Sequence, residues 1–291
     1  MSPGSGAPGP EELDGLPFYR QRVMQDGRTA PWTIDDLLAA APGDPFAGRV
    51  AAHTTPRLRL QLEASEDSSV WVGAEPDELR AWSTPLEGMF RRWGLRRGEL
   101  IAFFEYGSSP VVLLSSRSYC PYLGSGAGDR VGLDMVCNDG SASFAGRMSE
   151  LVRLLRPAAV VLRADVVAPL VAALALRGQD LAESVRWAAV SEVEGAVRRA
   201  DADRWQQELG VPVRRIARAD AAFFLAGDCP ECGLFHVDSG SYLLEELPGA
   251  ETVVTTVFAK SCPSVRYALW RASIHPPGCP TEPAAARLEW S

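Results

Sequence analysis

The sequence predicts an α/β fold in which a mixed sheet with crossover helices is followed by a small β-rich subdomain. From Gly98 to Gly210, short apolar segments alternate with segments of helical periodicity, the pattern of strands joined by crossover helices. From Gly233 onward, short β segments are separated only by turn residues, which is typical of antiparallel pairing. We therefore expect a disordered Gly/Pro-rich leader over 1–15, an α/β core over 16–232 and a β-rich subdomain over 233–291.

Ahead of the alternation, the sequence predicts two helices and two strands. The first helix covers 31–41, with Thr33 as its cap. The segments 58–62 and 69–72 are expected to be strands. A second helix runs from Pro76 to a stop at Gly94, because four apolar side chains recur at helical spacing: Leu79, Trp82, Leu86 and Phe90.

The remaining elements follow from the same two periodicities. Within the alternation we expect strands over 99–106, 130–137, 158–164 and 185–192, and helices over 143–157, 168–177 and 200–209. In the β-rich subdomain we expect β segments over 234–240, 242–247, 252–258 and 265–270.

Composition excludes several classes of partner. The formal net charge of −8 provides no basic surface for a phosphate backbone, so no nucleic-acid partner is expected. No apolar run reaches the roughly 20 residues that cross a bilayer, and the N-terminus has no signal-peptide pattern, so we expect a cytoplasmic protein without a membrane partner. Six cysteines in such a chain indicate reduced thiols, a metal site or both.

Two C-terminal segments carry a family resemblance. GLFHVDSGSYLLEEL, followed by ETVVTTVFAKSCPSVRYALW, resembles the phenylacetate–CoA ligases of the adenylate-forming family, and the likeness extends from about Leu58 to Cys279. The resemblance implies the large N-terminal domain of such an enzyme, with a cleft that binds an aryl or acyl small molecule, possibly as a thioester. It places five candidate substrate-binding residues at this cleft: Tyr106, Gly107, Ser108, Ile216 and Arg218.

The motifs that hold ATP in that family are altered here. The phosphate loop is replaced by LEASEDSSV, where Glu63, Glu66 and Asp67 should repel phosphates. The family's Tyr-Gly-x-x-Glu motif aligns with 216–220, where Asp220 could still hold a cation, and its ribose-binding Asp aligns with Arg271. The chain also ends near the point where the C-terminal lid domain of the family should begin. Together these differences predict that ATP is not a cofactor.

A separate group of cysteines predicts a metal site. Cys229 and Cys232 form a C-x2-C pair that His236 follows, and Cys279 lies beyond the next β hairpin. Three thiolates and one imidazole suit structural zinc, and the family resemblance also points to a zinc site near the end of the large domain. His275 and Cys262 are alternative fourth ligands. The competing interpretation is that His236 packs in its β segment and the cysteines are unrelated loop thiols.

Catalytic candidates are few. Cys262, beside the only lysine of the chain, Lys260, is the best free nucleophile, although an apolar cysteine in the turn before Pro263 is the simpler interpretation. Lys260 and Asp220 are the other two catalytic candidates.

Three functions remain open at this point. The first is a repurposed, ATP-independent protein of specialised-metabolite biosynthesis that binds or processes an aryl or acyl thioester or carrier-bound species. The second is a noncatalytic partner that stabilises an active ligase, and the third is an acyl- or aryl-CoA ligase. A carrier protein or a partner ligase is the protein partner that the first two imply.

Overall fold

A computed structural model describes residues 8–23, 28–40, 43–50, 55–65, 68–248, 251–269 and 271–290. Its centre is a nine-stranded mixed sheet with the strand order β13-β14-β9-β8-β7-β6-β5-β3-β4. Strands β3 to β7 pair in parallel, and the pairs from β7 to β13 are antiparallel. The strands are β3 Leu100–Phe104, β4 Asp134–Asn138, β5 Ala159–Arg163, β6 Trp187–Ser191, β7 Val213–Ala219, β8 Phe224–Asp228, β9 Phe235–Val237, β13 Ala272–His275 and β14 Ala286–Trp290. This mixed sheet confirms the predicted α/β fold.

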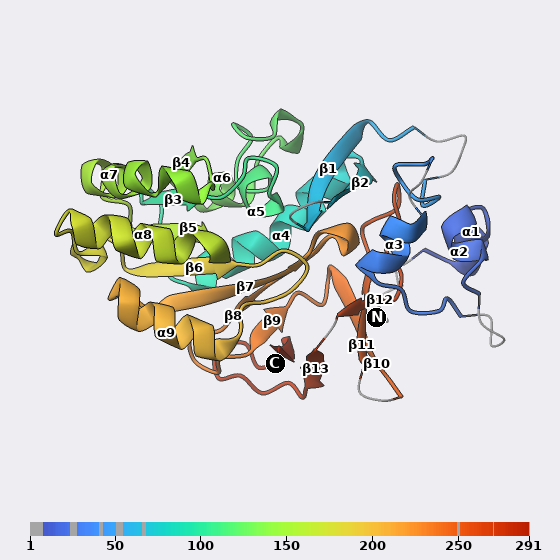
Figure 1. Cartoon of the computed structure of the whole chain (residues 1–291). Coiled ribbons are helices and arrows are strands. Elements are labelled where there is room, and N and C mark those ends of the chain that lie inside the picture. The colour runs from blue at the N-terminus through green and yellow to red at the C-terminus, as the bar shows by residue number, and fades with distance from the viewer. Residues whose placement is uncertain are drawn as a thin grey trace.

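Helices cover both faces of the sheet, and β3 shows why. Its side chains alternate, so that Ala102 and Phe104 enter one apolar core while Ile101 and Phe103 enter the other. Helices α7 (Ala145–Leu155), α8 (Ala164–Leu176) and α9 (Arg199–Leu209) pack on the first face (Figure 1). Helix α4 (Pro76–Arg92), accompanied by the short α5 (Pro110–Leu113) and α6 (Ala127–Val131), packs on the second.

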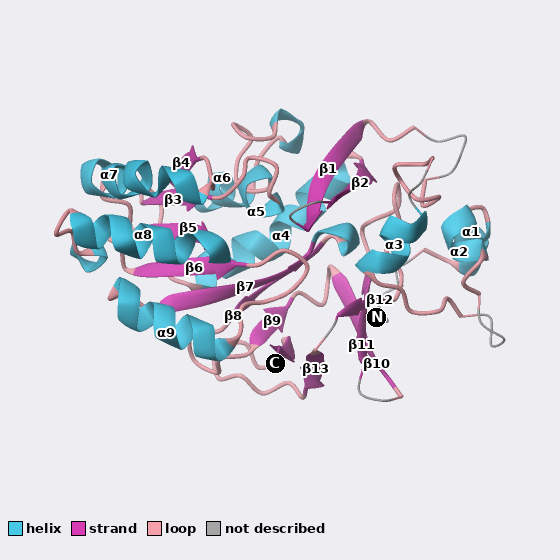
Figure 2. Cartoon of the chain, in the orientation of Figure 1, coloured by secondary structure: helices cyan, strands magenta, loops and turns pink. Residues whose placement is uncertain are grey.

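The N-terminal segment packs beside a separate three-stranded sheet, on the right of Figure 2. This small sheet is antiparallel and consists of β10 Tyr242–Leu247, β11 Glu251–Thr256 and β12 Tyr267–Leu269. Trp32 forms a parallel bridge with Tyr267, and the Tyr19 hydroxyl donates to the Pro263 carbonyl at 2.5 Å. The N-terminal helices are α1 Pro10–Asp14, α2 Pro17–Arg20 and α3 Ile34–Ala40.

Several predicted element boundaries shift for local reasons. Helix α3 begins at Ile34, and not at 31, because Thr33 caps it: the Thr33 hydroxyl accepts from the Asp36 N–H at 3.4 Å, and the Asp36 carboxylate accepts from the Thr33 N–H at 2.8 Å. Within the leader expected to be disordered, residues 10–14 form α1, and its Leu13 is buried. Residues 1–7 lie outside the described part.

The segment aligned with the phosphate loop belongs to a two-stranded hairpin. Strand β1 (Leu58–Ser65) pairs antiparallel with β2 (Ser68–Ala74), and both strands are longer than predicted. Glu66, Asp67 and the side chain of Glu63 lie outside what the structure describes.

The strands after residue 233 divide between two sheets. β10, β11 and β12 form the small sheet, whereas β9, β13 and β14 extend the large one. The large sheet thus contains strands from both sides of the predicted domain boundary at 232/233. That boundary stays a prediction. Among the described residues, no helix is both long and apolar enough to cross a membrane.

Candidate metal centre and buried polar network

The metal-site prediction depends first on a tight turn between β8 and β9. The turn reads Cys-Pro-Glu-Cys-Gly, and Gly233 supplies its left-handed conformation with φ of +70°. Two backbone hydrogen bonds of 2.8 Å close it, from the Gly233 N–H to the Cys229 carbonyl and from the Cys229 N–H to the Leu234 carbonyl. The turn therefore presents two thiols that are three residues apart, Cys229 and Cys232.

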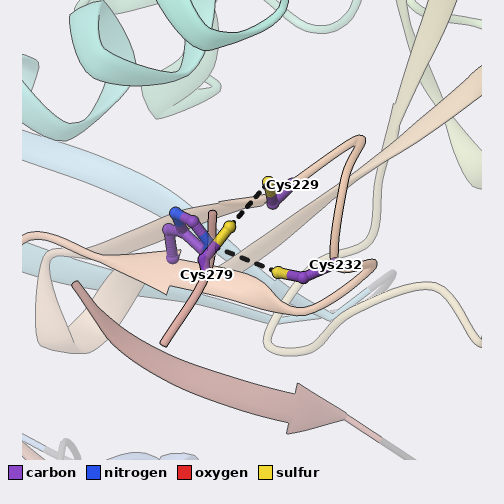
Figure 3. Close-up of side chains that lie close together, drawn as sticks. Cys229, Cys232 and Cys279 are labelled. Carbon is purple, nitrogen blue, oxygen red and sulfur yellow. Dashed lines mark hydrogen bonds between the residues drawn. The ribbon is translucent and has the colours of Figure 1, made fainter. Parts of the chain in front are cut away.

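The fold adds two further ligands to this turn. His236 follows on β9, and Cys279 reaches the site from the connection between β13 and β14 (Figure 3). The ligand atoms of Cys229, Cys232, His236 and Cys279 all lie within 4.8 Å of one another. The Cys229 and Cys279 sulfurs lie 3.7 Å apart, and the Cys232 sulfur lies 3.3 Å from His236 Nε2. Ligands of one tetrahedral zinc lie about 3.3–3.8 Å apart, so the donor set and its spacing fit a metal ion.

A carboxylate and an arginine hold the histidine in place. Glu282 Oε2 lies 2.6 Å from His236 Nδ1 and also 2.7 Å from Arg92 Nη1 on α4. Burial acts to raise the pKa of Glu282, but the hydrogen bond with His236 and the charge of Arg92 outweigh it and lower the pKa. The carboxylate is therefore an acceptor that fixes Nδ1 as the protonated nitrogen and leaves Nε2 for a metal.

Cys279 is set up as a thiolate by its own turn. Burial acts to raise its pKa, but hydrogen bonds from the Thr281 hydroxyl and from the Thr281 and Glu282 backbone N–H groups lower the pKa to about 6. The Thr281 hydroxyl lies 3.1 Å from the sulfur. A thiolate at neutral pH is the form that binds a metal.

Sequence reasoning identified the four ligands together but missed Glu282, Arg92 and the role of Gly233. The Gly directly after Cys232 was a signal in the sequence, whereas Arg92 is 190 residues from Glu282 and no local pattern marks it. The alternative ligands do not join this group. His275 pairs with Glu289 at 2.9 Å, and Cys262 is fully buried in the large apolar core.

A second cluster lies where the resemblance places the substrate cleft. The Arg218 guanidinium makes two hydrogen bonds to the Asp220 carboxylate, at 2.9 and 2.5 Å, and donates to the Ser109 hydroxyl at 3.0 Å. Glu105 lies 3.8 Å from Arg218 and accepts a hydrogen bond from Ser191. All five side chains are buried. The segments 106–109 and 216–220 therefore lie together, as expected. The contact between them is a hydrogen bond between two buried side chains, Arg218 and Ser109.

Glu194 extends this cluster toward the surface. Its carboxylate accepts from the backbone N–H groups of Asp220 and Ala221, at 2.8 and 3.2 Å, and from the Tyr267 hydroxyl at 2.5 Å. Burial, together with the nearby charge of Asp220, raises the pKa of Glu194 to about 7. Burial also raises the pKa of Glu105. Glu194 lines a hollow of about 310 Å³ whose rim includes Arg271.

The other candidate residues lie in different surroundings. Gly107 and Ser108 are exposed, and Tyr106 is half-buried beneath the Arg163 guanidinium, 4.2 Å from its ring centroid. Ile216 is fully buried. Cys262 has no exposed surface, which is the environment of an apolar cysteine, whereas Lys260 is exposed. Whether any of these residues contacts a substrate stays a prediction.

Solved structures with a similar fold include CoA ligases and an amide bond synthetase. A 2-hydroxyisobutyryl-CoA ligase in complex with 2-HIB-AMP and CoA matches 95% of this chain with a TM-score of 0.74 and 14% identity; this chain covers 69% of it. The anthranilate CoA ligase AuaEII in complex with anthranoyl-AMP has a TM-score of 0.51 at 14% identity, covering 72% of this chain and 41% of that one. The amide bond synthetase McbA from Marinactinospora thermotolerans has a TM-score of 0.51 at 13% identity, covering 79% and 48%.

These likenesses show the fold and not the activity. The chain spans 63–69% of the length of the hydroxyisobutyryl-CoA ligase chains that it matches. No family model matches the sequence, and no curated protein sequence matches it significantly. The chain therefore has the α/β fold of the N-terminal domain of adenylate-forming ligases, with a nine-stranded mixed sheet and a small antiparallel sheet.

Proposed function

We propose that this protein uses the adenylate-forming fold without ATP, to bind or process an aryl or acyl group carried as a thioester or on a carrier protein. The observation that carries the proposal is that the Asp220 carboxylate is buried and paired with Arg218. Both of its carboxylate oxygens are hydrogen-bonded to Arg218, and the side chain has no exposed surface. In the family that the chain resembles, this position supplies the carboxylate that binds magnesium. Because Arg218 occupies both oxygens of Asp220 here, no free carboxylate oxygen remains for Mg·ATP.

The ribose position supports the same conclusion. Arg271 stands where the resemblance places an aspartate, and a guanidinium is only a donor, so it cannot accept from ribose hydroxyls. The acyl part of the proposal is supported by the fold: the similar ligase was solved with an acyl adenylate and CoA, and the similar AuaEII with anthranoyl-AMP. A role in specialised-metabolite biosynthesis belongs to this proposal.

The proposal includes one structural zinc on Cys229, Cys232, His236 and Cys279. Four protein ligands complete a tetrahedron and leave no position for a reactive water, so the ion would act on stability and not on chemistry. It would join the β8–β9 turn to the connection between β13 and β14, and so fasten the antiparallel edge of the large sheet.

Calorimetry distinguishes this function from a ligase. Titration with Mg·ATP is expected to be flat to about 1 mM, whereas phenylacetyl-CoA is expected to bind with a Kd below that concentration. Pyrophosphate release with a panel of aromatic and fatty acids is the opposing result. If it occurs and disappears in Asp220→Asn, with circular dichroism unchanged, the protein is an acyl-CoA ligase and the proposal is wrong.

A further inference from the structure

A cavity of about 460 Å³ shares no lining residue with the metal centre or the Arg218 cluster. It is formed where the N-terminal segment, the residues just before β1 and the 260–263 segment meet. Apolar side chains supply part of its wall, among them Leu16, Pro56 and Pro263. Two cations also line it, Arg49 and Lys260.

Arg49 is an unusual wall residue because it is a buried cation without a carboxylate. The residue is buried, and among the described residues its guanidinium donates only to two backbone carbonyls, Ala221 at 2.8 Å and Trp71 at 3.4 Å. Within the same ranges its Nε has no hydrogen-bond partner, and no carboxylate oxygen lies within 4 Å of the guanidinium. The Trp32 ring, whose centroid lies 5.4 Å from Arg49 Cζ, adds a cation–π contact.

The acidic groups around the cavity are already engaged elsewhere. Glu75 lies 3.6 Å from Arg57 and accepts from its backbone N–H at 3.0 Å. Glu12 accepts from the Gly9 N–H at 2.8 Å. The buried Glu78, next to the cavity, accepts from the backbone N–H groups of Lys260 and Ser261, at 2.6 and 2.7 Å. Each acid therefore has its own donors, and none neutralises Arg49.

A buried guanidinium without a counter-ion destabilises a fold, and an anion beside it reverses that effect because the low-dielectric surroundings strengthen the attraction. We propose that this cavity binds a small organic anion, with its carboxylate or phosphate toward Arg49 and its apolar body against Leu16, Pro56 and Pro263. Lys260, which is exposed, contacts the same anionic group from the mouth. This site is independent of the acyl-thioester proposal and needs neither ATP nor the metal.

Binding of three probes tests the site: benzoate, phenyl phosphate and inorganic phosphate. Isothermal titration of the full chain should give saturable binding of at least one aromatic probe, with inorganic phosphate at least about 10-fold weaker because it has no apolar body. The stronger of benzoate and phenyl phosphate identifies which anionic group the site takes. Absence of binding by all three up to about 10 mM overturns the proposal.

Substitutions assign the binding to this cavity. Lys260→Met, at an exposed position that tolerates the change, should weaken the aromatic probe about 3- to 10-fold. Arg49→Met should abolish saturable binding and also remove the ligand-induced rise in melting temperature. The matched control is Arg177→Met, which removes an exposed arginine that pairs with Glu150 and does not line the cavity, and it should leave the Kd unchanged. If Lys260→Met and Arg49→Met bind the probe as the unmodified chain does, the anion lies elsewhere and the proposal is wrong.

Discussion

The hydrogen bond between Glu282 and His236 allows a test on a single side chain. Glu282→Gln retains the shape but replaces the charged acceptor, so His236 Nδ1 is held less firmly and Nε2 becomes a weaker donor to a metal. Loss of such a partner typically reduces metal affinity about 10- to 100-fold. Competition with a chromophoric chelator measures it. The matched control is Glu289→Gln, which breaks the similar pair with the half-buried His275 and should leave the affinity unchanged.

Glu194 determines a pH dependence of stability. Its pKa is raised from 4.5 to about 7 in the folded chain, so the folded state binds the proton more tightly than the unfolded state does. The stabilisation is complete below the unfolded pKa and is lost as pH rises through the folded one. Glu194→Gln mimics the protonated carboxyl, accepts the same N–H groups and removes this loss.

We therefore expect the free energy of unfolding of Glu194→Gln, relative to the unmodified chain, to rise by about 1 to 3 kcal/mol between about pH 5 and pH 8. Urea unfolding at several pH values measures the difference. A difference that stays constant with pH would show that Glu194 is ionised in the folded chain throughout that range.

At the scale of elements, the turn between β8 and β9 depends on Gly233. Gly233→Ala places a side chain at φ of +70°, and its Cβ would lie 2.9 Å from Arg199 Nη1. Gly178→Ala is the matched control, since Gly178 has φ of +60° and no heavy atom within 4 Å of the same Cβ position. Both variants should lose about 1 kcal/mol from the left-handed backbone. Gly233→Ala should lose more, and weaken metal binding, as urea unfolding and chelator competition would measure.

The elements also show how far the sequence could lead. Strands β3, β5 and β6 were predicted because their apolar runs are uninterrupted, and α4 because its apolar face repeats and Pro76 begins it. Strand β7 was missed because three arginines interrupt it. Its Arg215 is nevertheless buried, because it pairs with Asp228 at 3.2 Å and stacks 4.7 Å above the Phe235 ring. Such compensation comes from other strands and leaves no local pattern.

The same limit applied to the candidate sites. Four metal ligands were found because two of them share one turn and a third follows four residues later, so local spacing carried most of the signal. The edge strand β13 and its neighbour β14 were not predicted, although the connection between them brings Cys279 to the other ligands. The pairing of Arg218 with Asp220 is local, but the Ser109 and Glu105 that complete that cluster lie about a hundred residues earlier.

At the scale of the whole molecule, removal of the metal should loosen the antiparallel edge of the large sheet. Cys232→Ser and Cys279→Ser each remove one ligand, so we expect loss of the ion and a free energy of unfolding lower by about 3 kcal/mol, which is on the order of 10 °C in melting temperature for a chain of this size. Elemental analysis and thermal unfolding measure both. Cys120→Ser changes a buried thiol outside the site and should keep the metal. Protein purified without chelator and found free of zinc would contradict the metal assignment.

The contact between Tyr19 and Pro263 has a consequence for synthesis on the ribosome. These residues are 244 positions apart, and Trp32 bonds to Val265 across a similar interval of 233. At about 5–20 residues per second, translation takes roughly 10–50 s to supply the partners of the N-terminal segment. During that interval Phe18, Tyr19 and Trp32 have no apolar surface of the small sheet to cover them. The emerging chain therefore presents three large aromatic side chains to chaperones before its own fold can bury them.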